Sequence, residues 1–252
     1  MKNFFIFILI VAVAVLAYFL VRKDREVFTP NEEPISENPV TEEETSEDVF
    51  FDDTKEVFTE NTATFEAKIE YPSFGNVGID KRIKDFVMKD LSDFKKGTDV
   101  TNENPVAKNN YGATYKVVKT SEITSIIFTF SEYTGGAHGN IRVRTLNFDN
   151  KNLESLSIGS LFRAESDYLT KISTVSRTEL KKDLGGEENA TWINDGTTPT
   201  NDNFDSFYLK DDNTLVIIFQ PYQVAPWVEG VPEVVINITN NLKEIFNEKY
   251  LP

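Results

Sequence analysis

The residues of this sequence that could carry chemistry gather first in a glycine-rich run. Gly135, Gly136 and Gly139 surround His138, the one histidine of the chain. Glycine permits positive backbone φ angles and an imidazole can bond loop carbonyl groups, so the favoured interpretation is a tight hairpin held by its histidine. The alternative is a recognition loop, in which the glycine-rich backbone, His138 and the adjacent Tyr133 bind a ligand. Catalysis by this loop is the least favoured interpretation.

A second segment, residues 219–230, carries the sequence FQPYQVAPWVEG. Its aromatic residues Tyr222 and Trp227, together with Trp192, could stack on sugar rings, although large aromatic residues beside prolines pack more often at a strand corner. From the two segments we take seven candidate binding residues: Tyr133, Gly135, Gly136, His138, Asn140, Tyr222 and Trp227.

The composition excludes several kinds of site. The chain has no cysteine, which removes disulfides, thiol nucleophiles and cysteine–zinc sites, and a single histidine removes multi-histidine metal sites. A serine nucleophile would need His138 positioned by a carboxylate, and the sequence carries no signature of that arrangement. Acidic pairs of the kind used by glycosidases arise by chance among the 28 acidic residues of positions 57–252. We therefore expect no catalytic residue, no metal and no cofactor.

The chain is strongly acidic. It has 26 basic and 41 acidic residues and a net charge of −15, which disfavours binding to the phosphate backbone of nucleic acids. Residues 57–252 alone contain 21 basic and 28 acidic residues, a net charge of −7. A cationic protein is a partner that this charge would attract.

The first part of the chain predicts a membrane anchor. Residues 4–21 form an unbroken apolar run flanked by basic residues, and as a helix they would reach roughly 27 Å, nearly the hydrocarbon thickness of a bilayer. We favour an uncleaved anchor at residues 1–25 over a removed signal peptide, because cleavage after Ala17 would leave an apolar stub. The flanking charges taken alone argue for a cytoplasmic C-terminus, but long domains are translocated largely regardless of charge.

Residues 26–56 are predicted to be a disordered acidic linker, since they contain twelve acidic residues, one lysine and three prolines. Beyond them the apolar periodicity predicts an α+β fold with a mainly antiparallel sheet, two longer helices and a short C-terminal helix. The middle strand of the first three-strand run is apolar on both faces and is expected to be central. The expected strands are 64–71, ended by Pro72, then 113–120, 123–133, 140–148, 207–209, 215–220 and 233–238; the expected helices run from Ile79 to Phe94, from Ser166 to Leu184, and through Leu242, Ile245 and Phe246.

Several spaced motifs in one order give the sequence a family resemblance. They are the run YTGGAHGN at 133–140, Asn147-Phe148-Asp149, the run LSIGSLF at 156–162, and the segment 219–230. A preceding element, Tyr71-Pro72 followed by Ile79-Asp80, has aspartate where the family has a capping asparagine. Over roughly residues 57–250 the chain resembles the extracytoplasmic region shared by the lysozyme-responsive anti-sigma factor RsiV and the peptidoglycan deacetylase PdaC. The resemblance implies a PdaC-type domain at 57–133 and an RsiV-like domain at 134–252.

The resemblance also implies a place and a class of function. It implies a single-pass cell-membrane protein with its C-terminal domain extracytoplasmic, acting at the cell wall and recognising a lysozyme-like hydrolase. The alternatives are a peptidoglycan-binding module and, less favoured, a carboxylate-dependent envelope hydrolase. In the deacetylase the chemistry resides in a separate metal-dependent domain, which this sequence lacks up to Pro252, so we expect no enzyme. In the anti-sigma factor a cytoplasmic segment holds the sigma factor, whereas only Met1, Lys2 and Asn3 precede the apolar run here.

Overall fold

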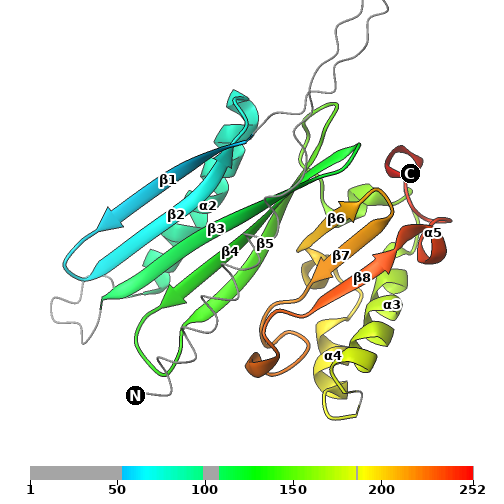
Figure 1. Cartoon of the computed structure of the whole chain (residues 1–252). Coiled ribbons are helices and arrows are strands. Elements are labelled where there is room, and N and C mark those ends of the chain that lie inside the picture. Colours follow the sequence, from blue (N-terminus) through cyan, green and yellow to red (C-terminus); the bar gives the residue numbers. More distant parts are fainter. Residues whose placement is uncertain (1–52, 99–107, 186, 252) are drawn as a thin grey trace, which may run out of the picture. The chain divides into compact units, whose positions relative to one another are not determined.

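The computed structural model describes residues 53–98, 108–185 and 187–251, which belong to one compact unit (Figure 1). The predicted anchor at 1–25 and all but the last residues of the predicted linker at 26–56 lie outside these ranges. Among the described residues, no helix is both long and apolar enough to span a bilayer.

Five strands form the first sheet and lie in the order of the chain. Neighbours are antiparallel except β2 and β3, which are parallel and therefore need a crossover connection. Helix α2 (Val77–Gly97) supplies that connection. The strands are β1 (Thr54–Asn61), β2 (Phe65–Ser73), β3 (Asn109–Lys119), β4 (Ile123–Tyr133) and β5 (Asn140–Asp149).

Helix α2 begins where two side chains satisfy backbone groups of its first turn and of the turn before it. Asn76 is the N-cap, and its side chain accepts hydrogen bonds from the N–H groups of Gly78 and Ile79 at 3.0 and 3.1 Å. Asp80, for which the sequence predicted a capping role, accepts instead from the N–H of Phe74 at 2.7 Å. This aspartate therefore fixes the turn that leads from β2 into α2.

The core of the first sheet lies between the sheet and α2. Ile83, Val87 and Leu91 recur at helical spacing and are buried against the sheet, which carries the fully buried Phe128 and Phe130 on β4. On the opposite face of β4, Ile127 packs against a separate cluster that reaches the second sheet. The strand is apolar on both faces because each face has its own packing partner.

The second sheet is antiparallel, with the order β6-β7-β8, and helices pack against it (Figure 1). Its core is built from buried residues of the strands and of α3, such as Leu215, Ile217, Ile172 and Leu180. The strands are β6 (Phe207–Asp211), β7 (Thr214–Ile218) and β8 (Glu233–Asn237); the helices are α3 (Tyr168–Asp183), α4 (Ala190–Gly196) and α5 (Ile238–Asn241), with short 3-10 helices η1 (Ile158–Leu161), η2 (Asn201–Phe204), η3 (Trp227–Glu229) and η4 (Glu248–Tyr250).

Side chains join β5 of the first sheet to β6 of the second. The Asn147 amide donates a hydrogen bond to the carbonyl oxygen of Phe207 at 3.0 Å, and the N–H of Phe207 donates to the Thr145 hydroxyl at 3.1 Å. A buried cluster that includes Val143 and Val216 fills the contact. Asn147, the first residue of the Asn-Phe-Asp motif, thus ties the two sheets together.

The predicted fold class is confirmed, since the chain folds into mainly antiparallel sheets with two longer helices and a short helix near its end. The three strands predicted between residues 113 and 148 are present as antiparallel neighbours, and β4 is an interior strand although β3 holds the middle of the sheet. The domain boundary expected between residues 133 and 134 stays a prediction. It lies between β4 and β5, two strands of one sheet.

Some details of the prediction were wrong. Pro72 does not end its strand but lies inside β2, because an additional strand, β1, pairs Lys55 with it. That strand begins at Thr54, within the last residues of the predicted linker. The final helix begins at Ile238, where the side chain of Asn237 caps it, so the predicted apolar positions follow the helix instead of forming it. Helix α4 was not predicted.

Candidate functional site

The glycine-rich run forms the loop between β4 and β5. Gly135 and Gly136 have φ angles of 92° and 109°, which other residues rarely adopt. The Tyr133 hydroxyl donates to the carbonyl oxygen of Gly136 at 3.2 Å, and Nδ1 of His138 lies 3.0 Å from the carbonyl oxygen of Gly139. The loop therefore has the geometry of a hairpin whose histidine lies beside a loop carbonyl group.

The loop also contacts the second candidate segment. The imidazole of His138 stacks on the indole of Trp227, with ring centroids 4.3 Å apart and an angle of 24° between the planes. Trp227 opens η3 and is partly exposed, whereas His138 is exposed. Two of the residues chosen from separate segments are thus brought together at one surface.

Two other candidate residues lie outside this stacked pair. Tyr222 has a φ angle of 68° and is 51% exposed, and its ring centroid lies 6.3 Å from that of Trp192 on α4. Trp192 is itself 39% exposed. Asn140 is exposed at the first position of β5. The 219–230 segment therefore contributes to two exposed aromatic pairs.

Two glutamines of the same segment hold it in place, and neither is among the residues predicted for the site. The side chain of Gln220 accepts from the N–H of Val143 at 2.9 Å and donates to the carbonyl oxygen of Val143 at 2.6 Å, so it continues the pairing at the edge of β5. The Gln223 amide donates to the carbonyl oxygens of Gly196 and Asn203, each at 3.0 Å. The sequence contained a signal for this role, because amide side chains that flank a proline turn can form hydrogen bonds with backbone groups.

A buried ion network braces the hairpin that carries the glycine-rich loop. Arg142 of β5 donates to both carboxylate oxygens of Asp90 on α2, at 2.9 and 2.7 Å, and also pairs with Glu132 of β4. The hydroxyl of Tyr111 on β3 donates to Asp90 at 2.6 Å. Asp90 is only 4% exposed. The carboxylate of Asp90 thus joins α2 to β3 and β5, and Arg142 extends the network to β4.

The network keeps Asp90 ionised. Burial by itself raises the pKa of Asp90, but the hydrogen bonds from Arg142 and Tyr111 and the charges of Arg142 and Arg144 outweigh burial, so the pKa lies below its usual value. The same balance applies to Asp149. Burial raises its pKa, but its contacts with Lys249 and Tyr250 outweigh burial and hold the pKa below its usual value.

The lowered pKa values predict how stability depends on pH. A carboxylate whose pKa is depressed on folding contributes stability that is complete above its unfolded pKa, near 4, and is lost as the pH falls through the folded pKa. We expect the free energy of unfolding to fall progressively below about pH 5. Urea unfolding between pH 7 and pH 3 measures this. Asp149→Asn should flatten the profile, whereas the exposed Asp85→Asn should not; equal effects would contradict the assignment.

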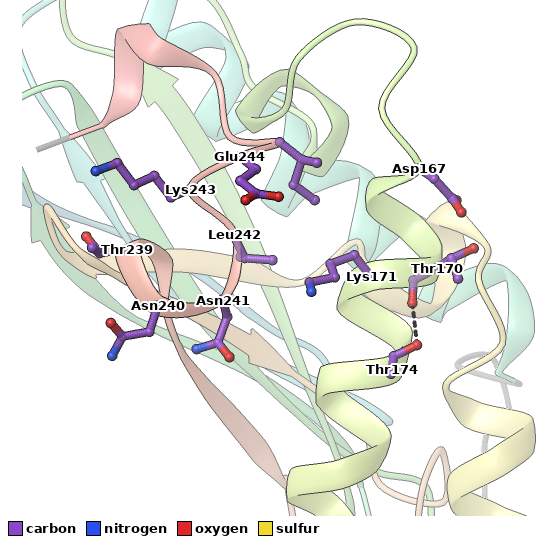
Figure 2. A pocket seen from close by; sticks show the side chains of 11 residues that line it. Asp167, Thr170, Lys171, Thr174, Thr239, Asn240, Asn241, Leu242, Lys243 and Glu244 are labelled. Carbon is purple, nitrogen blue, oxygen red and sulfur yellow. Dashed lines mark hydrogen bonds between the residues drawn. The ribbon is translucent and has the colours of Figure 1, made fainter.

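A polar groove lies on the second half of the chain, apart from the loop. Its volume is about 610 Å³, and it lies between the first turns of α3 and the segment from Thr239 to Ile245, which includes most of α5 (Figure 2). Lysine, aspartate, glutamate, threonine and asparagine side chains line most of it. Within the described residues, no group of three or more His, Asp or Glu side chains is arranged to hold a metal ion.

The fold and the two regions of the chain match known families. Residues 58–141 match the family described as "Deacetylase PdaC", and residues 159–239 match "Protein of unknown function (DUF3298)". The crystal structure of a DUF3298 family protein from Pseudomonas aeruginosa PAO1 superposes with a TM-score of 0.64, covering 81% of this chain and 98% of that one at 14% identity. A member from Bacteroides fragilis NCTC 9343 gives 0.56, covering 79% and 94% at 18% identity. The chain thus has the DUF3298 type of fold.

Two relatives from Bacillus subtilis (strain 168) are similar in sequence. The peptidoglycan-N-acetylmuramic acid deacetylase PdaC is 34% identical over 190 residues, which are 75% of this chain and 40% of that protein. The anti-sigma-V factor RsiV is 31% identical over 114 residues, 43% of this chain and 39% of that protein. The chain spans about two fifths of the length of each relative. It belongs to the PdaC/RsiV-like family, as the motifs indicated.

Proposed function

We propose that this chain is an extracytoplasmic binding module that acts at the cell wall and recognises peptidoglycan through the glycine-rich loop and Trp227. The observation that carries the proposal is the stacked pair of His138 and Trp227, which joins the two candidate segments at the surface. An aromatic face beside backbone groups of a glycine-rich loop offers both stacking and hydrogen bonds, the combination that an amide-bearing sugar needs. Tyr133 supports the loop, and Asn140 lies at its exposed end.

The relatives and the sequence support the proposed location. PdaC is named as an enzyme that acts on peptidoglycan, which supports a wall ligand for a chain that shares its PdaC region. The predicted anchor at residues 1–25 would hold the described residues next to the wall. The second aromatic pair, Tyr222 and Trp192, offers a further stacking surface on the same segment. The proposal is one of binding, and it assigns no reaction to the chain.

Sedimentation of the full chain in detergent with purified peptidoglycan sacculi tests the proposal. Trp227→Ala should weaken binding about tenfold or more, because exposed tryptophans at binding surfaces often carry much of the affinity. His138→Ala should also weaken it, and neither substitution should change the unfolding midpoint much, since His138 is exposed and Trp227 partly exposed. Val235→Ala, at an exposed position of β8, is the matched control. Wall binding that all three variants retain would contradict the proposal.

A cationic lysozyme-like hydrolase is the second candidate ligand. The net charge of −7 on residues 57–252 favours it, and so does the motif resemblance to the lysozyme-responsive anti-sigma factor described above. The two candidates differ in their dependence on salt, because attraction between charged proteins is screened whereas ring stacking is not. Binding to a cationic lysozyme that weakens steeply between low and physiological salt, without binding to sacculi, would favour the hydrolase.

A further inference from the structure

The groove between α3 and the segment after α5 is a separate feature from the loop surface. Trp227 precedes β8, whereas the second wall of the groove follows it, and the two sites share no residue. The groove volume of about 610 Å³ is within the range of about 300–1,000 Å³ that is usual for small-ligand sites. It is large enough for a ligand of its own.

Both walls of the groove carry both signs of charge: Lys171 and Asp167 lie on the α3 wall, and Glu244 and Lys243 lie on the other. Figure 2 shows Lys171 extending from α3 toward the segment that follows α5, and the carboxylate of Glu244 on that second wall. Neither side chain forms an ion pair within the described residues. The Lys171 nitrogen and the Glu244 carboxylate oxygens are therefore more than 4.0 Å apart. An anion alone would therefore meet attraction and repulsion at each wall. A ligand that carries both charges would satisfy both walls.

The remaining polar groups of the groove are suited to a peptide. The Asn241 amide nitrogen donates to the carbonyl oxygen of Asn237 at 3.0 Å, which leaves its side-chain oxygen to accept a hydrogen bond. The Thr174 hydroxyl donates to the carbonyl oxygen of Thr170 at 2.8 Å and likewise keeps its acceptor capacity. Acceptors for peptide N–H groups therefore line both walls.

We propose that this groove binds a short peptide with a free carboxylate, which pairs with Lys171, and a free ammonium group, which pairs with Glu244. Peptidoglycan stem peptides belong to this chemical class. The groove would therefore bind the peptide part of the polymer, while the loop surface binds the sugar part. The identification with stem peptides rests on the proposed function; the preference for a peptide of mixed charge rests on the groove alone.

Calorimetric titration of the full chain in detergent with N-acetyl-L-Ala-D-isoGln-L-Lys-D-Ala tests the groove, because this peptide has one carboxylate and one ammonium group. Lys171→Met and Glu244→Gln should each weaken binding about tenfold or more, the loss expected for one charge-assisted contact. Lys181→Met on the same helix and Glu187→Gln, both exposed and outside the groove, should leave it unchanged.

Modified peptides make the test specific for each charge. The C-terminal amide of the peptide should bind the native chain as weakly as the parent peptide binds Lys171→Met, and it should lose nothing further in that variant. The side-chain-acetylated peptide should behave in the same way toward Glu244→Gln. Absence of peptide binding, or equal losses in Lys171→Met and Lys181→Met, would overturn the groove proposal. If the peptide does not bind but sacculi do, the proposed function stands and the groove proposal fails. If the peptide binds but sacculi do not, the groove proposal is supported and the proposed function is contradicted.

Discussion

Replacing Asp90 with alanine is expected to lower the free energy of unfolding by about 3 kcal/mol, the lower end of the range for breaking a buried ion pair. The substitution leaves Arg142 and Tyr111 without the carboxylate that they share in the folded state. Arg142 is 36% exposed, so water can solvate part of its charge, and this is why we expect the lower end. Chemical unfolding at pH 7, followed by circular dichroism, measures the change.

Asp93→Ala provides the matched control for this prediction. Asp93 lies on the same helix, one turn from Asp90, but its side chain is 50% exposed and pairs with lysines at the surface. Exposed pairs of this kind contribute little to stability, so the control should change the unfolding midpoint only slightly. Similar losses for the two variants would show that Asp90 does not act as the centre of a buried network.

A second large effect is expected for Gly196→Ala. A Cβ atom at Gly196 would lie 2.0 Å from the carbonyl oxygen of Gln223 and 2.9 Å from a methyl group of Val224. The first of these neighbours is backbone, so the segment that carries Tyr222 and Trp227 must move to make room. We expect a loss of about 3 kcal/mol in the free energy of unfolding, the upper end of the usual cost of overpacking. The proposed binding to peptidoglycan should weaken with it.

Gly97→Ala is the control for the glycine substitution. Gly97 ends α2, its φ angle is not positive, and nothing lies within 4 Å of a Cβ built there. Alanine is the better helix former, so this change should leave stability unchanged or raise it slightly. Thermal unfolding of the two variants side by side measures both effects. If the Gly196→Ala protein is as stable as the Gly97→Ala protein, the turn at Gln223 can move aside without a loss of stability.

The elements that the sequence predicted well are those with a clear buried face. Ile83, Val87 and Leu91 of α2 pack on one side of the helix, and β4 is buried on both faces, so their spacing in the sequence reflects their packing. β1 could not be recognised in this way. It is an edge strand whose side chains are mostly exposed, and only Phe58 of its residues packs on the core. Helix α4 has seven residues, too few for a helical period to be visible.

The candidate site could be predicted by residue type but not by arrangement. His138 and Trp227 were both chosen from the sequence, yet their stacking depends on the way β5 meets β6, which no local pattern encodes. Asp90 was overlooked although a signal was present: it is a charged residue at helical spacing among the buried residues of α2. A buried carboxylate on an apolar helix face needs a cation beside it, and Arg142 supplies that cation.

The contact between Tyr250 and Asp149 has a consequence for the order in which the chain folds. The Tyr250 hydroxyl donates to Asp149 at 2.8 Å across 101 positions of the sequence, and Lys249 pairs with the same carboxylate. A chain made from its N-terminus completes β5 well before these partners emerge, and contacts so distant in sequence form slowly. We expect Asp149 to stay without these two partners until η4 docks. The two sheets would therefore reach their final stability in one late step that they share.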